Sequence, residues 1–405
     1  MFDGINTLDD VEVKGKTVLV RIDINSGIGE DGKIINNPRF VASGVTIKEL
    51  ASKGAKVVLL AHQGRPGDDE FRSLKEHAEF LSQETGLEVR FVRDVIGPVA
   101  LDRIKEMRGG DVILLENVRF LAEENLEADA KSASKSVYVQ KLAACAEMYV
   151  NDAFSVSHRG QASLVGFPSL LPSFAGRSMQ RELTAVDTLL GHEKEAVFLL
   201  GGMKLKEVLD IISAMCKHGK ASKILLAGMP ALLFLKAKGL NLGEKNEEIF
   251  TSHNGEEFLS LAKELWKNYL EIIATPVDVA VDIDTKRKEY SVLDLPLNYI
   301  IRDIGVKTIK NYAEIIKSAK TVFAKGVPGE FEKREFSLGT KELGKALTET
   351  KAFTVMGGGA WSTAFKEFNL DQTKISHVSL SGGALLEALS GKKLPGVEAL
   401  RQKQG

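Results

Sequence analysis

The segment TVLVRIDIN, residues 17–25, decides the fold class, because an apolar, β-branched run is followed at once by polar residues. Such a run favours a strand that is covered on both faces. Comparable runs lie at 56–61, 87–92, 112–116, 148–150, 196–200, 224–226, 272–274, 299–301, 321–324, 353–356 and 377–380. Helical periodicity fills gaps such as 74–84 and 130–146. This alternation predicts the α/β class, with parallel sheets between layers of helices.

The length of 405 residues exceeds one ordinary core and predicts two large domains. A stretch containing Pro and Gly at 166–172 is followed by a helical pattern at 177–190. We interpret that helix as the connector and hinge. The predicted domains are therefore 1–172 and 173–390, and the second includes the connector helix.

Composition excludes several classes of protein. With 54 Lys and Arg against 55 Asp and Glu, the chain lacks the basic excess of a nucleic-acid-coating protein, although a local anion site is allowed. The longest apolar stretch, 224–235, is interrupted by Gly228 and Pro230 and is too short to span a membrane. Cys145 and Cys216 have neither metal-ligand nor redox spacing, and no signal pattern opens the chain. We therefore expect a cytoplasmic protein with no nucleic-acid partner, no membrane partner and no metal site of its own.

Cationic and polar residues follow the strands of the first half. Because ligands bind at the carboxyl ends of parallel strands, these residues are expected to converge. They are Arg21, Asp23 and Asn25, then His62, Gln63, Gly64 and Arg65, then Glu116, Asn117 and Arg119, and finally Asn151, Asp152, His158 and Arg159. Converging guanidinium groups suit a small phosphate or carboxylate ligand that is held bidentately.

Glycines take the same place in the second half. They are Gly201, Gly202, Gly228, Gly305, Gly326, Gly329, Gly357–Gly359, Gly382 and Gly383. Glycine lets backbone N–H groups and helix N-termini approach the phosphates of a nucleotide. A site rich in Arg and a site rich in Gly together indicate a bisubstrate enzyme that moves a group from a nucleotide to a small anion. A dehydrogenase or a glycosyl transferase on two similar domains is a weaker alternative, because the glycines at 27–32 have no helix after them.

These motifs resemble, in order and spacing, those of the phosphoglycerate kinase family, and its archaeal branch most closely. The first-half motifs are RIDIN at 21–25, HQGRP at 62–66, LENVRF at 115–120, NDAF at 151–154 and HR at 158–159. The second-half motifs are GGMK at 201–204, DIG at 303–305, GEFE at 329–332, GGG at 357–359 and LPG at 394–396. The resemblance implies two doubly wound, Rossmann-like parallel-sheet domains joined by a hinge helix. It also implies that the tail, 391–405, packs back on the first domain.

The resemblance further implies which residues bind the two substrates. For 3-phosphoglycerate they are Arg21, Asp23, Asn25, Arg39, His62, Gln63, Gly64, Arg65, Arg119 and Arg159, with Arg21 bracing the cluster. For the nucleotide they are Lys204, Gly228, Gly305, Lys325, Glu332, Gly357, Gly358, Gly359, Ala360 and Trp361, with Glu332 reaching the ribose. The implied reaction is reversible phosphoryl transfer between ATP and the carboxylate of 3-phosphoglycerate, giving 1,3-bisphosphoglycerate, in glycolysis and gluconeogenesis. Arg39 and Lys204 would be the catalytic cations, and Mg²⁺ would arrive with ATP or ADP on a monomeric enzyme.

Departures from the family concentrate in the nucleotide half. Val208 stands where many relatives have a second Lys, Ala360 where many have an Asp, and Lys325 where many have an amide. Lys325 either faces the phosphates and supplies charge there or points to solvent. The alternative function is a catalytically weak relative that binds the phosphoacid as a sensor.

Overall fold

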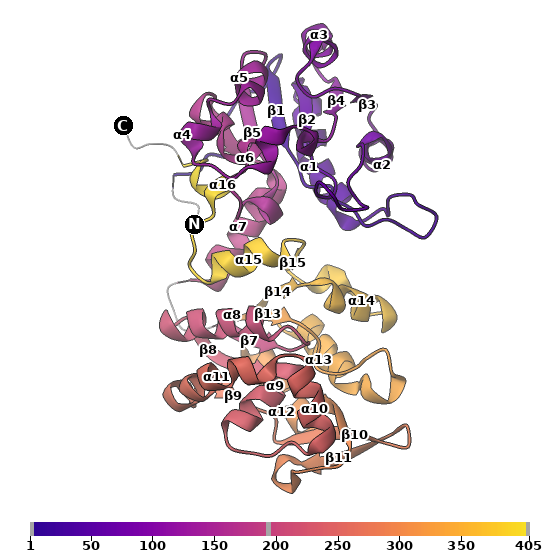
Figure 1. Cartoon of the computed structure of the whole chain (residues 1–405), viewed down its shortest axis with the longest axis vertical. Coiled ribbons are helices and arrows are strands. Elements are labelled where there is room, and N and C mark those ends of the chain that lie inside the picture. Colours follow the sequence, from indigo (N-terminus) through magenta and orange to yellow (C-terminus); the bar gives the residue numbers. More distant parts are fainter. Residues whose placement is uncertain (1–3, 192–195, 402–405) are drawn as a thin grey trace. The chain divides into compact units, whose positions relative to one another are not determined.

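The computed structural model describes residues 4–191 and 196–401. The chain divides into two compact units (Figure 1). Unit 1 contains the described residues up to Thr184, the segment Gly383–Ala388 and the residues from Lys392 onward. Unit 2 contains Ala185–Gly382 and Leu389–Gly391.

Unit 1 is built on a six-stranded sheet whose pairs are all parallel, in the order β3-β4-β2-β1-β5-β6. Its strands are β1 (Thr17–Arg21), β2 (Lys56–Leu60), β3 (Val89–Val92), β4 (Val112–Leu115), β5 (Met148–Asn151) and β6 (Ser173–Ala175). Its helices are α1 (Pro38–Ser52), α2 (Lys75–Thr85), α3 (Pro98–Glu106), α4 (Ala130–Ala133), α5 (Val137–Ala143), α6 (Ala162–Val165) and α16 (Pro395–Glu398). Short 3₁₀ turns include η1 (Val118–Phe120), η2 (Ala122–Asn125), η3 (Phe154–Val156) and η4 (Phe167–Ser169).

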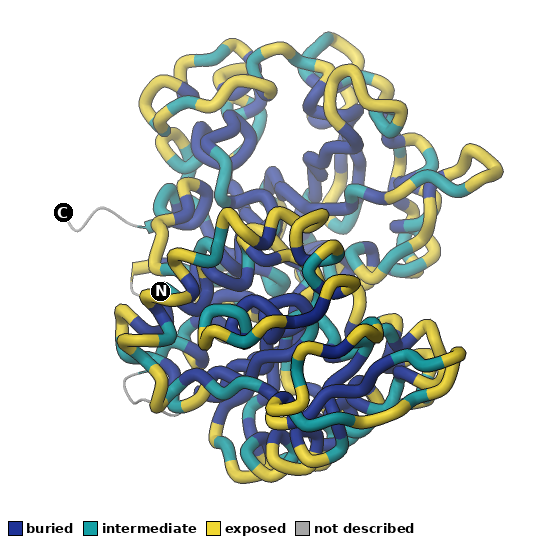
Figure 2. Tube along the Cα trace, turned by 60° about the horizontal axis from the view of Figure 1, so that its bottom comes forward, coloured by how far each residue is buried: buried dark blue, intermediate teal, exposed yellow. Residues whose placement is uncertain are grey.

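Strand β1 lies at the point where the strand order reverses, with β2 on one side and β5 on the other. All five of its residues are buried, so both faces of the sheet are covered there. Figure 2 shows buried segments of the chain in dark blue and exposed loops in yellow. Ligands of open α/β sheets bind at such a switch point, which directs attention to the carboxyl end of β1 at Arg21.

Unit 2 repeats the plan with a second all-parallel sheet, in the order β15-β14-β13-β7-β8-β9. Its strands are β7 (Ala196–Leu200), β8 (Ala221–Leu226), β9 (Ile273–Ala274), β13 (Thr321–Lys325), β14 (Phe353–Gly357) and β15 (His377–Ser379). Its helices are α8 (Leu205–Lys217), α9 (Gly228–Ala237), α10 (Glu244–Ser252), α11 (Gly255–Tyr269), α12 (Val306–Ser318), α13 (Leu338–Glu349) and α14 (Gly359–Glu367); α15 (Gly382–Leu389) follows β15. The predicted class, two doubly wound α/β domains, is confirmed.

A separate three-stranded antiparallel sheet, which the sequence did not predict, belongs to unit 2. It has the order β11-β10-β12 and consists of β10 (Asp278–Ile283), β11 (Lys286–Ser291) and β12 (Ile300–Ile304). The run at 299–301 was expected in a parallel sheet, and that expectation is wrong, because β12 pairs antiparallel to β10.

One further local prediction is corrected, and one strand was not predicted. The predicted helix 130–146 is divided into α4 and α5, because the side chain of Ser136 caps a new helix by accepting from the Val139 amide. The segment before the connector contains strand β6, which was not predicted.

The predicted helix at 177–190 is present as α7 (Arg177–Leu189), and the division between the units falls within it. Its role as a hinge stays a prediction. None of the helices in the described part of the chain has the length and apolar character that a membrane span requires.

Candidate functional site

Three guanidinium groups gather at one edge of the unit 1 sheet. Arg21 ends β1, Arg119 lies in η1 after β4, and Arg159 follows η3 after β5. Burial and the neighbouring charges of Arg21 and Arg159 lower the pKa of Arg119 to about 10. Repulsion between neighbouring cations that lowers the pKa of an arginine marks a place where a bound anion would be stabilised. The predicted convergence of these cations is confirmed.

His62 contacts the innermost of these arginines. Its Nδ1 lies 3.0 Å from Nη2 of Arg21, and both side chains are buried. Burial and the charge of Arg21 hold the pKa of His62 well below its usual range. The imidazole is therefore neutral at physiological pH and adds a hydrogen-bonding group rather than another charge.

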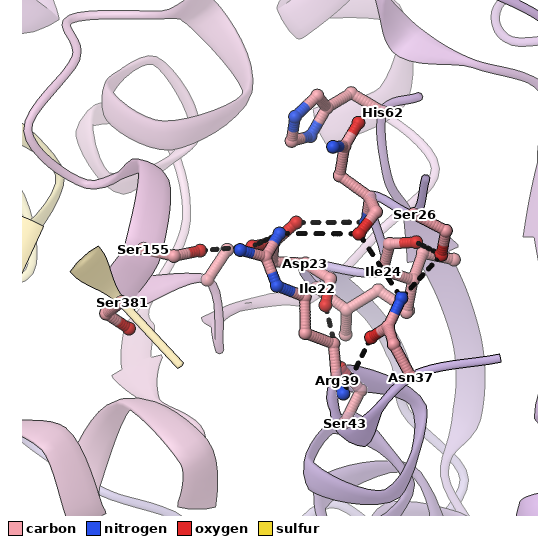
Figure 3. A network of polar contacts seen from close by, with 12 residues as sticks. Ile22, Asp23, Ile24, Ser26, Asn37, Arg39, Ser43, His62, Ser155 and Ser381 are labelled. Atoms are coloured by element: carbon pink, nitrogen blue, oxygen red, sulfur yellow. Dashed lines mark hydrogen bonds and ion pairs between the residues drawn. The ribbon is translucent and has the colours of Figure 1, made fainter. Parts of the chain in front are cut away.

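Asp23 and Arg39 form an ion pair beside this cluster, shown in Figure 3. Arg39 Nη1 lies 2.8 Å from Asp23 Oδ2, and the Ser155 hydroxyl donates to the same oxygen. Burial raises the pKa of Asp23, but the charge of Arg39 and the other contacts outweigh it and lower the pKa to about 2. Asp23 is thus a permanent anion that fixes Arg39.

The backbone of Arg39 is fixed by a helix cap. Arg39 lies in the first turn of α1, where the Asn37 side chain accepts from the Arg39 amide at 2.9 Å. The Asn37 amide group donates to the Ser26 hydroxyl at 2.7 Å, which joins the cap to the loop after β1 (Figure 3). The Arg39 side chain remains 30% exposed, so it can also meet a ligand.

Three other predicted residues shape the loop after β2. Asn25 Oδ1 accepts from the Gly64 amide at 2.8 Å. Gly64 has a φ of +63°, and a Cβ there would lie 2.5 Å from backbone atoms of Glu70, so only glycine fits. The Gln63 amide group is buried and makes its hydrogen bonds to Ser26, Glu70 and His77. Gln63, which was predicted to bind substrate, therefore has a supporting position in this loop, whereas Arg65 beside it is exposed.

Two strand-end residues serve packing instead. Asn151 Nδ2 donates to the Gly396 carbonyl at 3.2 Å. Asp152 Oδ1 accepts from the amides of Ser178 at 2.7 Å and Met179 at 3.1 Å, at the start of α7. Burial raises the pKa of Asp152 to about 7, although these hydrogen bonds oppose it.

Unit 2 contains a cavity of about 480 Å³ at the carboxyl ends of β7, β8, β13 and β14. Eight of the predicted nucleotide residues line it: Lys204, Gly228, Lys325, Glu332, Gly357, Gly358, Gly359 and Ala360. Its lining includes the apolar side chains of Leu232, Ile249 and Ile301, which suit a flat base, together with glycines and lysines.

Gly305 and Trp361 do not line this cavity. Gly305 precedes α12, and a Cβ there would lie 2.2 Å from the carboxyl carbon of Asp278, so the glycine is explained by packing. The side chain of Trp361 is fully buried in the core against Phe365. Neither residue therefore belongs to the lining of the cavity.

Lys325 faces the cavity and not solvent, since its side chain is only 12% exposed. Its Nζ lies 2.8 Å from Glu207 Oε2, and Nζ of Lys204 lies 3.4 Å from Glu207 Oε1. Burial raises the pKa of Glu207, but Lys325 and Lys204 outweigh it and lower the pKa, so the carboxylate is ionised. Sequence reasoning missed Glu207, although it lies in the first turn of α8, three residues after Lys204, which is the N-cap residue of that helix.

Comparison with known proteins gives one consistent family. A family model described as phosphoglycerate kinase matches residues 8–392. The phosphoglycerate kinase of Methanothermus fervidus is 42% identical over 398 residues, covering 98% of this chain and 97% of the relative. That of Sulfolobus acidocaldarius is 41% identical over 402 residues, covering 98% and 95%. The crystal structure of phosphoglycerate kinase from Pyrococcus horikoshii OT3 has a TM-score of 0.87 at 36% identity, covering 98% of both chains.

Proposed function

The chain belongs to the phosphoglycerate kinase family, and from this membership we propose how its own residues perform the reaction. The enzyme transfers a phosphoryl group between ATP and the carboxylate of 3-phosphoglycerate, a step of glycolysis. All the relatives reported above carry the enzyme's name, which favours catalysis over the phosphoacid-sensor alternative.

The cluster of Arg21, Arg119 and Arg159 is the observation that carries the substrate assignment. We propose that this cluster binds the phosphate of 3-phosphoglycerate, because a dianion would neutralise the repulsion among buried Arg21, buried Arg119 and half-buried Arg159. Neutral His62 and exposed Arg65 complete this set. Asp23, Asn25 and Gly64 hold the loops around it, and Gln63 supports them from beneath.

Arg39 and Lys204 are the proposed catalytic cations. The attacking carboxylate has an ordinary pKa near ~4 and is ionised at neutral pH, so no general base is needed. Catalysis is then in-line positioning and neutralisation of the charge on the transferring group. Asp23 holds Arg39 at 2.8 Å, and Lys204 has a 77% exposed side chain at the mouth of the cavity, so it is accessible to a phosphate.

The unit 2 cavity is the proposed nucleotide site. Its glycines, among them Gly357, Gly358 and Gly359, offer backbone N–H groups to phosphates, and its apolar side chains offer a surface to the base. Mg²⁺ would enter bound to ATP or ADP and neutralise part of the phosphate charge. Ala360 brings no carboxylate to this cavity, and we propose that Lys204 and Lys325, which also line it, supply positive charge to the phosphates.

A reciprocal pair of variants tests both assignments on the full-length chain. Arg119→Met should abolish calorimetric binding of 3-phosphoglycerate and leave ADP binding intact, because the two ligands use different residues. Lys204→Met should weaken ADP binding and leave 3-phosphoglycerate binding intact. The two variants are controls for each other, because the ligand that one loses is retained by the other. The assignments are wrong if either variant loses the other ligand instead.

We also propose a cytoplasmic monomer. Cys145 and Cys216 are free thiols, as expected in a reducing compartment. Light scattering of the purified protein tests the monomer directly.

A further inference from the structure

The guanidinium of Arg21 is completely buried, and each of its nitrogens has a partner. Nε donates to the Ser163 hydroxyl at 2.8 Å, Nη1 donates to the Ile22 carbonyl, and Nη2 lies 3.0 Å from His62 Nδ1. The planar guanidinium has a rigid fork of donors, so one orientation satisfies all three contacts. Arg21 is therefore a fixed element and not a side chain that adapts to a ligand.

Ser163 and Glu124 hold the guanidinium in that orientation through a chain of hydrogen bonds. The Ser163 hydroxyl accepts from Arg21 and donates to Glu124 Oε1 at 2.6 Å, while the Ser163 amide donates to Glu124 Oε2 at 2.8 Å. The Glu124 side chain is fully buried, and burial raises its pKa although Arg21 and Ser163 oppose this. A second buried group, the Tyr149 hydroxyl, holds Ser163 by donating to its carbonyl at 2.7 Å.

The contact between Arg21 and His62 fixes where the imidazole carries its proton. A guanidinium has no acceptor, so the short contact requires Nδ1 of His62 to accept. In a neutral ring the proton is then on Nε2. The charged groups that influence the ring are Arg21, Asp23, Arg119 and Arg39, so three cations oppose a second proton and one carboxylate favours it.

We propose that Ser163 and Glu124 are positioning residues that orient Arg21 so that it fixes the tautomer of His62. His62 then presents Nε2–H to the anionic substrate as a neutral donor among cations. This inference rests on the proposed 3-phosphoglycerate site for its consequence, but the tautomer itself is a property of the free protein. Neither Ser163 nor Glu124 is expected to touch the substrate.

The tautomer is measured by ¹⁵N NMR of the imidazole nitrogens in the ligand-free, full-length protein. The signal that disappears in His62→Gln identifies His62 among the seven histidines of the chain. We expect Nδ1 to have the shift of an unprotonated nitrogen and Nε2 that of a protonated one. In Ser163→Ala, which removes the acceptor of Arg21 Nε, we expect averaged shifts that report both tautomers.

Binding is measured on the same proteins by calorimetry. Ser163→Ala should weaken 3-phosphoglycerate binding about tenfold, the effect of one charge-assisted hydrogen bond, and leave ADP binding unchanged. Ser134→Ala is the matched control, because Ser134 is also a buried serine of unit 1 and its hydroxyl bonds only to the Lys131 carbonyl in this structure. If Ser163→Ala does not fold, Glu124→Gln takes its place, since it weakens the same support.

The outcomes separate this inference from the proposed function. A wild-type His62 protonated on Nδ1, or variants with unchanged shifts and affinity, would overturn the positioning role even if 3-phosphoglycerate binds. Failure of the wild type to bind 3-phosphoglycerate, with the Nε2–H tautomer present and lost in Ser163→Ala, would overturn the proposed function and leave the positioning role standing.

Discussion

Nucleotide affinity should follow the net charge of three side chains in the unit 2 cavity. Lys204 and Lys325 contribute two positive charges and Glu207 one negative charge, which leaves a net charge of +1 in the wild type. Lys325→Met lowers this sum to 0, Glu207→Gln raises it to +2, and the double variant returns it to +1. ADP affinity is therefore expected to rank Glu207→Gln first, the wild type and the double variant equal, and Lys325→Met last.

The size of each step follows from distance and exposure. Two unit charges about 4 Å apart interact by about 4 kcal/mol at an effective dielectric constant near ~20. Lys325 is 12% exposed, but Glu207 is 37% exposed and Lys204 77%, so water and salt screen much of this energy. We expect about 1.4 kcal/mol for each unit of charge, which is about tenfold in affinity.

Calorimetric titration of ADP with Mg²⁺ into the four proteins tests the ranking. Repeating it at high salt should shrink the steps, because the interaction is electrostatic. Lys345→Met serves as the control, since Lys345 pairs with Glu342 at 2.8 Å in the same unit but does not line the cavity. A double variant that binds as weakly as Lys325→Met would refute the charge argument and assign Lys325 a specific contact.

Three more perturbations have defined outcomes. Arg39→Ala should lower kcat by about three to five powers of ten with little change in 3-phosphoglycerate affinity, as for an arginine that meets transition-state charge; steady-state kinetics with a normal kcat and a raised KM would make it a binding residue instead. Burial raises the pKa of Asp152 to about 7 in the folded protein, against an ordinary value of 3.8. The contribution of Asp152 to the free energy of unfolding is therefore fully present below pH 4, and roughly 4 kcal/mol of it is lost as the pH rises to 7. Asp152→Asn should flatten this dependence in denaturation at pH 5 and pH 8, and parallel pH dependences of variant and wild type would contradict the assignment. Gly64→Ala places a Cβ 2.5 Å from the Glu70 backbone at a φ of +63°, so we expect a lower Tm and weaker 3-phosphoglycerate binding, and an unchanged Tm would show that the loop can move.

Elements with a continuous apolar run were predictable, and those without one were not. Strand β1 consists wholly of buried residues, so its sequence carries the signal directly. The hairpin of β10 and β11 lacks such a signal, because β11 reads KRKEYS and its residues are half-exposed or exposed. Its turn places Asp284 and Thr285 at positive φ, where the usual glycine signal is missing.

Site residues were predictable where the family motif includes them and they lie at the end of a strand. Arg21 ends a strand, and His62 and Arg119 follow strands, so topology alone brings them together. Ser163 is 142 positions from Arg21, and no periodicity in the sequence relates the two. Trp361 differs from these residues: the resemblance assigned it to the nucleotide site, but helix α14 turns its side chain into the core.

The contact between Asn151 and the Gly396 carbonyl has a consequence for how the protein is made. The Gly396 amide also donates to the Ser157 carbonyl at 2.8 Å. Arg401 forms an antiparallel β-bridge with Ile5, so residues 396–401 belong to the packing of unit 1. During translation all of unit 2 leaves the ribosome before residues 396–401 emerge. Unit 1 therefore lacks these contacts until unit 2 has been synthesised, and a premature stop near residue 390 would damage the half of the enzyme that was synthesised first.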